Sequence, residues 1–251
     1  DTTADIIVFC GEDFMAETAK ILNPSKTVLL PALMARCPMA GMVSPQGLKD
    51  LQKNYPQAKT VCYVNTTAEI KALSDVCCTS ANAVEIVKKI DVEQIIFVPD
   101  ENLANYVQSQ MPDKQIIAWK GFCYVHSRIM VEQLKQAKKM HPGAKVIVHP
   151  ESPTDIINQA DCVTSTTGMI KYAKNSNSNI FIIATEIGMV HRLQKELPDK
   201  KFYGVGGTCI QMKKNSLELV LESLEKNQHQ IKVPEEIRIK AKKSIQKMLD
   251  N

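Results

Sequence analysis

The stretch that decides the fold is YVNTTAEIKALSDVCCTSANA, residues 63–83. It predicts the end of one strand, a short helix, a second short strand and the start of another helix. Residues 149–168, HPESPTDIINQADCVTSTTG, repeat this frame 86 positions further on, so that Asp75 falls on Asp161. The polar residues at the strand ends differ between the two copies. This pattern predicts one scaffold used twice around a shared site, with different chemistry on each copy.

Three cysteines follow the same spacing. Cys37, Cys123 and Cys209 lie 86 positions apart, and each follows a predicted strand. Solenoid repeats run at roughly 20–50 residues, so this longer period is that of a small domain. Since a βαβ unit takes about 30 residues, each copy has room for more than one. The three cysteines can meet only if the three units pack around a pseudo-threefold axis.

Predicted strands and helices alternate along the whole chain. We expect strands at residues 5–10, 27–30, 60–64, 94–98, 116–119, 145–149, 179–184 and 201–204. We expect helices at residues 13–22, 45–54, 68–73, 82–90, 103–110, 129–140, 189–196, 216–225 and 234–249. Thr66 and Glu69 have capping-box spacing, which predicts Thr66 as the N-cap of its helix. The alternation predicts the α/β class, with three similar three-layer αβα units built on parallel sheets.

The repeat also predicts how the chain divides. We expect a first αβα unit at residues 1–43, a second at 44–126, a third at 127–209 and C-terminal helices at 210–251. The first unit is expected to be incomplete at its start and to be completed by residues 210–251. The counterpart of Tyr63 in that unit would fall before residue 1, so we expect about half a copy to be missing from the front.

Composition places further bounds on function. The chain has 251 residues, of which 44% are hydrophobic and 23% charged, and this is ordinary for a globular protein with a sizeable core. No apolar run approaches the roughly 18 residues of a membrane span. The net charge of +4 is concentrated in residues 226–251, where a solvated helix face is favoured over a nucleic-acid patch. Eight cysteines without a secretory signal indicate a reducing compartment, so we expect a cytoplasmic protein with neither nucleic acid nor membrane as a partner.

Three converging thiols predict a metal site. They could bind zinc with a histidine or water as the fourth ligand, or an iron–sulfur cluster with one iron left open. Structural zinc sites usually contain a C-x-x-C pair, and this sequence has none. The cysteines therefore favour a cluster, and an open iron can act as a Lewis acid toward a carboxylate or hydroxyl group.

Polar side chains follow two equivalent strands. Tyr63 and Asn65 end the first, and His149 and Glu151 take their places in the second. Ligands of α/β units bind outside the carboxyl ends of the strands. Tyrosine and asparagine supply hydrogen bonds there, and histidine with glutamate can move protons.

Hydroxyl side chains open two predicted helices. Ser80 lies in TSAN, and Ser165 and Thr166 lie in TSTTG. Hydroxyl and free backbone N–H groups at a helix start suit a phosphate or carboxylate, although helix capping would explain them equally well. GVGG at residues 204–207 is not a dinucleotide fingerprint, because no helix opens on it at the right spacing.

Longer motifs resemble a known family. CPMA, YVNTTAEIKALSDVCCTSANA, PDENLANYV, GFCYVH, HPESP, TEIGMVHRL and CIQMKKNSLE occur in the order found in quinolinate synthases. The resemblance implies three αβα units, a 4Fe–4S cluster, and condensation of iminoaspartate with dihydroxyacetone phosphate to quinolinate, with loss of phosphate and water, on the route to NAD. It adds L-aspartate oxidase, which supplies iminoaspartate, as a candidate partner.

The resemblance also assigns roles to residues. It implies that Cys37, Cys123 and Cys209 are the cluster ligands. The catalytic residues would be Tyr63, His149 and Glu151, and these would bind substrate together with Asn65, Ser80, Ser165 and Thr166.

The sequence departs from the family pattern at a few places. Gly41 and Thr164 stand where the family often has aspartate and glycine. A His-x-Tyr stretch and a Gly-Asp-Ser loop, which face the same site in the family, belong to the front segment that the sequence lacks. The alternatives are therefore an inactive truncated enzyme, a non-enzymatic α/β binding module, or a zinc-stabilised scaffold that uses the same cysteines.

Overall fold

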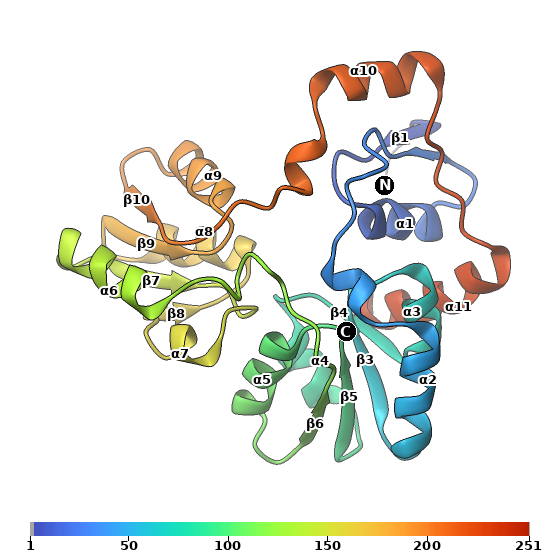
Figure 1. Ribbon diagram of the computed structural model, residues 1–251, viewed down its shortest axis with the longest axis horizontal. Helices are drawn as coiled ribbons and strands as arrows, with labels where there is room; N and C mark the ends of the chain where they lie inside the picture. The colour runs from blue at the N-terminus through green and yellow to red at the C-terminus, as the bar shows by residue number, and fades with distance from the viewer. Residues whose placement is uncertain (1–2, 251) are drawn as a thin grey trace.

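The computed structural model describes residues 3–250 and contains three parallel β-sheets flanked by helices (Figure 1). Two of the sheets have four strands and one has two. The sheets form three lobes in Figure 1, which confirms the predicted α/β class. Among residues 3–250, no helix combines the length and the apolar character needed to cross a bilayer.

The first sheet pairs β1 (Ile6–Val8) with β2 (Thr27–Leu29), and α1 (Asp13–Leu22) connects them. The connection is long enough for the βαβ crossover that parallel strands require. A 3₁₀ helix, η1 (Met39–Met42), follows β2 and leads into the second sheet. In the described residues, β1 pairs only with β2.

The second and third sheets have the same topology. The second has the strand order β4-β3-β5-β6, and the third has the order β8-β7-β9-β10. The second contains α2 (Pro45–Asn54), β3 (Lys59–Tyr63), α3 (Ala68–Leu73), β4 (Val76–Cys78), α4 (Ala83–Lys89), β5 (Gln94–Val98), α5 (Glu101–Gln110) and β6 (Gln115–Ala118). The third contains α6 (Val131–Met140), β7 (Lys145–Val148), α7 (Thr154–Ile157), β8 (Cys162–Val163), α8 (Thr166–Asn175), β9 (Ile180–Ala184), α9 (Gly188–Glu196) and β10 (Lys201–Gly204). Each strand order places the second strand of its unit at one edge.

An ion pair recurs at the start of both four-stranded sheets. Asp75 lies 3.1 Å from Lys59 and accepts a hydrogen bond from the backbone N–H of Thr60. Asp161 lies 2.8 Å from Lys145 and accepts a hydrogen bond from the backbone N–H of Val146. The 86-residue repeat is therefore present in side-chain contacts as well as in strand order.

The central strands are buried on both faces, as expected of a parallel sheet covered by helices. In the second sheet, Val61 and Phe97 pack on one face, and Cys62 and Ile96 pack on the other. All four are fully buried. Burial of a large apolar side chain contributes about 1.5–3 kcal/mol, so these strands form the centre of their unit.

Two helices close the chain. After a short 3₁₀ turn, η2 (Met212–Lys214), α10 (Leu217–Lys226) lies beside β1. The last helix, α11 (Glu235–Leu249), packs against α3 and β4 of the second sheet (Figure 1). The expected division into residues 1–43, 44–126, 127–209 and 210–251 stays a prediction, as does completion of the first unit by the last segment.

The predicted cap of α3 is wrong by one residue. Thr67 is the N-cap, and its hydroxyl accepts from the backbone N–H of Ile70 at 3.5 Å. The hydroxyl of Thr66 instead donates to the Tyr63 carbonyl oxygen at 2.9 Å. This bond holds Thr66 at the end of β3, so the helix starts one residue later than the capping-box spacing suggests.

Candidate functional site

One cavity of about 560 Å³ joins most of the residues that the sequence singled out. Those that line it are Cys37, Cys123, Cys209, Tyr63, Asn65, His149, Glu151 and Thr166. They come from all three sheet units. Each lies at or after the carboxyl end of a strand or opens a helix. The arrangement brings thiol, imidazole, carboxyl and phenol groups to a single space.

The three repeat cysteines reach this cavity from equivalent loops. Cys37 precedes η1, Cys123 follows β6, and Cys209 follows β10. Burial, with a smaller contribution from the charge of Glu12, raises the pKa of Cys37 to about 12. Burial and the charge of Glu151 also raise the pKa of Cys123. Since thiolates are the metal-binding form, a bound cation would supply the positive charge that these buried sulfurs need.

Two carboxylates that the sequence analysis missed hold the cysteine loops. Asp100 accepts from the backbone N–H of Cys123 at 3.1 Å, and Glu186 accepts from that of Cys209 at 3.3 Å. Asp100 and Glu186 are themselves 86 positions apart, so the repeat spacing could have identified them. Burial and the charge of Glu151 raise the pKa of Asp100 well above its usual range.

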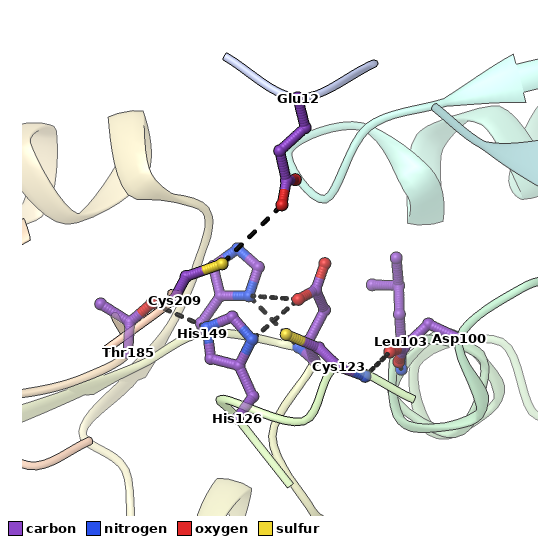
Figure 2. A network of polar contacts seen from close by, with 9 residues as sticks. Glu12, Asp100, Leu103, Cys123, His126, His149, Thr185 and Cys209 are labelled. Atoms are coloured by element: carbon purple, nitrogen blue, oxygen red, sulfur yellow. Dashed lines mark hydrogen bonds and ion pairs between the residues drawn. The ribbon is translucent and has the colours of Figure 1, made fainter. Parts of the chain in front are cut away.

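Glu12 occupies the matching place in the first unit but makes a different contact. In all three units, the residue after this carboxylate donates its backbone N–H to the carbonyl oxygen two residues before the repeat cysteine. For Glu12, this bond runs from Asp13 to Ala35. Its carboxyl group is buried and lies 3.8 Å from the sulfur of Cys209 (Figure 2). Burial, followed by the charge of Asp13, raises its pKa. Glu12 is not among the site residues predicted from the sequence.

Tyr124 connects two of the cysteine loops. Its hydroxyl lies 3.6 Å from the sulfur of Cys209 and accepts from the backbone N–H of Ile210 at 2.9 Å. Since Tyr124 is next to Cys123, this contact ties the loop of the second unit to that of the third.

The strand-end residues form an electrostatically coupled group. Burial and the charge of His126 lower the pKa of His149 to about 4, so its ring is neutral near pH 7. Burial works to raise the pKa of Glu151, but the charge and close contact of His126 outweigh it and lower the pKa. Burial and the charge of Glu151 raise the pKa of Tyr63. Near pH 7 the group therefore contains a neutral imidazole, a carboxylate and a phenol.

His126 also belongs to this group, and it was not among the residues predicted from the sequence. Its Nδ1 atom lies 2.8 Å from Oε2 of Glu151, and its ring stacks on that of His149 with the centroids 4.6 Å apart (Figure 2). Cys123, His126 and Glu151 each offer a metal-ligand atom, and these atoms lie within 4.8 Å of one another. Oε1 of Glu151 is buried and has no hydrogen-bond partner among the described residues. This donor set suits a soft or borderline metal.

The predicted hydroxyl residues divide between two positions. Thr166 lines the cavity at the start of α8. Ser165 caps the same helix by accepting from the backbone N–H of Gly168 at 3.2 Å. Ser80 and Ser165 do not line the cavity, and their contact with a substrate stays a prediction.

Two cations at the cavity were also missed. Arg192, on α9, and Lys213, in η2, both line it. Lys213 lies 3.6 Å from Glu186, and Arg192 bonds to Glu196 at 2.9 Å. Neither stood out in the sequence, because both lie among other lysines and arginines.

Known proteins similar to this chain agree with the geometry. The family model described as "NadA: Quinolinate synthetase A protein" matches residues 1–250. The chain is 55% identical over 247 residues to a quinolinate synthase of Thermodesulfovibrio yellowstonii, and the match covers 98% of this chain and 82% of that protein. It is 52% identical to quinolinate synthase 1 of Methanosarcina acetivorans, covering 98% and 81% of the two chains. It is 49% identical to a quinolinate synthase of Clostridium kluyveri, covering 99% and 83%. With this level of identity along its whole length, and with the repeat cysteines gathered at one cavity, the chain belongs to the quinolinate synthase family.

Proposed function

We propose that this chain condenses iminoaspartate with dihydroxyacetone phosphate to form quinolinate, releasing inorganic phosphate and two molecules of water. The observation that carries the proposal is the single cavity that three repeat cysteines share with His149 and Glu151. Family membership supports the same reaction, and it supports a place in the synthesis of NAD.

We further propose that Cys37, Cys123 and Cys209 hold a 4Fe–4S cluster. Their thiols line one cavity and are free of disulfides, which fits a three-cysteine ligand set. When bound, such a cluster supplies an open iron that acts as a Lewis acid toward an oxygen of the substrate.

The chain's own residues account for the proton transfers of the condensation. The neutral ring of His149 can accept a proton from a carbon next to a carbonyl or imine group. Glu151, as a carboxylate, stabilises the positive charge that then develops on the ring. The Tyr63 hydroxyl, kept protonated by burial and by Glu151, can donate a hydrogen bond to a substrate oxygen.

Both proposed substrates are anions, and the cavity offers groups that bind anions. Thr166 opens the 10-residue helix α8, where free backbone N–H groups and the helix dipole favour a phosphate or carboxylate. Arg192 and Lys213 add positive charge at the same cavity. We propose that these groups bind the phosphate of dihydroxyacetone phosphate and the carboxylates of iminoaspartate.

The test is anaerobic purification of the chain, followed by iron and sulfide analysis and an assay of quinolinate by chromatography. A brown protein with about four irons per chain and quinolinate formation from the two substrates are the expected results. Serine variants of Cys37, Cys123 and Cys209 are expected to lose iron and activity. Cys10→Ser is the matched control, because Cys10 is exposed and does not line the cavity.

One observation favours a second candidate function. Cys123, His126 and Glu151 could hold a single ion, which would suit a zinc-stabilised binding module. Such a protein would be colourless, would contain about one zinc per chain, and would lose that metal in His126→Ala but not in Cys37→Ser. Four irons that depend on Cys37 would exclude this alternative.

We also propose a cytoplasmic location and a functional connection with L-aspartate oxidase. Eight free thiols are typical of a reducing compartment. An enzyme that oxidises L-aspartate to the imine would supply iminoaspartate, so co-purification of the two proteins from cells is the appropriate test.

A further inference from the structure

His126 has the contacts of a residue that acts through its neighbours. It lies in the loop after β6, three positions after Cys123, and is 7% exposed. Its two ring nitrogens face two different elements of the third sheet. Nε2 lies 2.8 Å from the hydroxyl oxygen of Thr185, at the end of β9, and Nδ1 lies 2.8 Å from Oε2 of Glu151, after β7 (Figure 2).

The contact with Glu151 is short. Nδ1 of His126 lies 2.8 Å from Oε2, close enough for a donor at this position to restrain the carboxylate. A polar contact between buried groups is stronger than in water, because the low local dielectric screens it less. The carboxylate of Glu151 is thus held through Oε2, while Oε1 has no hydrogen-bond partner in the described chain. One oxygen is restrained, and the other remains available to a ligand.

The ring of His126 also restrains His149. The two rings are nearly parallel, at 15°, with the centroids 4.6 Å apart. The backbone N–H of Glu151 donates to Nδ1 of His149 at 3.4 Å, so Nε2 of His149 is left for other partners. His149 has 4% of its surface exposed, and the stacked ring covers one of its faces. His126 therefore contacts both members of the pair that we assign to proton transfer.

We propose that His126 is a positioning residue that is anchored by Thr185 and holds Glu151 and His149 in their reactive orientation. This inference rests on the proposed function, because it assigns the pair its role in the condensation. It adds a residue that the sequence resemblance did not include. The anchor, Thr185, directly follows β9, so the position of His126 depends on the third unit as well as on its own loop.

The experiment compares four variants of the chain, each purified anaerobically. His126→Ala removes both contacts, whereas in His126→Asn the amide group can still donate to Glu151 from the position of Nδ1. Thr185→Val removes the anchor, and His191→Asn is an exposed control that does not line the cavity. Loss of a supporting contact of this kind typically costs about 10–100-fold, so His126→Ala should lower kcat by that factor. The iron content is expected to change little, and KM is expected to rise by less than kcat falls.

Rescue separates positioning from simple structural support. His126→Asn is expected to recover about tenfold of the lost kcat, and Thr185→Val is expected to fall between His126→Ala and the wild type. A second measurement is a double-mutant cycle with Glu151→Gln. If His126 acts through Glu151, then His126→Ala has little further effect in the Glu151→Gln background. Additive losses, or an asparagine variant no more active than the alanine variant, would overturn the inference.

A readout without turnover distinguishes failure of this inference from failure of the proposed function. Affinity for quinolinate is measured by calorimetry on the same variants, with the wild type assayed for quinolinate formation in parallel. An inactive wild type would refute the proposed function for this chain. The inference would then be supported by weaker quinolinate binding in His126→Ala that His126→Asn restores, and overturned by equal binding in all variants.

Discussion

The carboxylate of Asp100 accepts a hydrogen bond at 3.1 Å from the backbone N–H of Cys123, which lies 23 residues further along the chain. The other oxygen of Asp100 accepts from the backbone N–H of Leu103 at 2.6 Å and so caps α5. One side chain therefore fixes the start of a helix and the loop that follows the next strand. Glu186 makes the same connection to Cys209 in the third unit.

Asp100→Asn is expected to loosen the Cys123 loop. The amide side chain keeps one acceptor oxygen, so either the helix cap or the bond to Cys123 is lost. An unsatisfied buried N–H costs about 1–3 kcal/mol, so the melting temperature and the iron retained after chelation should both fall. Asp113→Asn, in the exposed turn before β6, is the matched control. Unchanged iron retention in Asp100→Asn would contradict this role.

Gly121→Ala and Gly206→Ala are expected to disrupt the same loops. A Cβ atom at Gly121 would overlap the carbonyl oxygen of Pro99, and one at Gly206 would overlap that of Thr185. Backbone atoms cannot move aside without shifting the strand ends, so we expect about 1–3 kcal/mol of destabilisation. Urea denaturation measures the effect. Gly41→Ala, in the Cys37 loop, has open space around the new Cβ and should be neutral.

Acid is expected to destabilise the protein partly through His149. The pKa of this residue is about 4 in the folded state and 6.5 in its ordinary environment. Its contribution is complete above pH 6.5, and it is lost as the pH falls from 6.5 toward 4, because only the unfolded chain takes up the proton. Between pH 7 and pH 5 the loss is about 2 kcal/mol.

The measurement for this prediction is urea denaturation of the metal-free chain at pH 7 and at pH 5. His149→Asn cannot take up the proton, so its stability should fall by about 2 kcal/mol less than that of the wild type. Groups outside the His149 cluster titrate alike in both proteins, and their effects cancel in the comparison. Equal losses in the two proteins would argue against a neutral, buried His149.

Arg192→Ala is expected to raise KM for dihydroxyacetone phosphate with little change in kcat. Arg192 lines the cavity from α9, whereas His149 and Glu151 reach it from the segment after β7. A hydrogen bond to a charged group is worth about 1.5–3 kcal/mol, and partial exposure reduces this, so an increase of about tenfold is expected. Lys195→Ala, on the same helix and outside the cavity, should leave KM unchanged. A fall in kcat alone would assign Arg192 a different role.

The sequence by itself determined the α/β class, the 86-residue repeat and the three cysteines that line the cavity. These features are local or periodic, so they can be read from residue patterns. The predicted helix at residues 13–22 has the bounds of α1, and the predicted strand at 60–64 differs from β3 by one residue at each end. The cap of α3 was the error, because Thr66 bonds to the strand before it rather than to the helix after it.

Asp100 and Glu186 mark the limit of what the repeat could reveal. Their spacing was present in the sequence, but their role depends on backbone N–H groups 23 residues away. His126 had no such signal, because the position 86 residues later is Met212.

Only the tertiary structure decided that His126 contacts Glu151 and Thr185, and that Glu12 faces Cys209 rather than its own loop. The physical reason is that these contacts join loops from different sheets. Their distances are set by how the buried strands and helices pack, and no local pattern of residues records that packing.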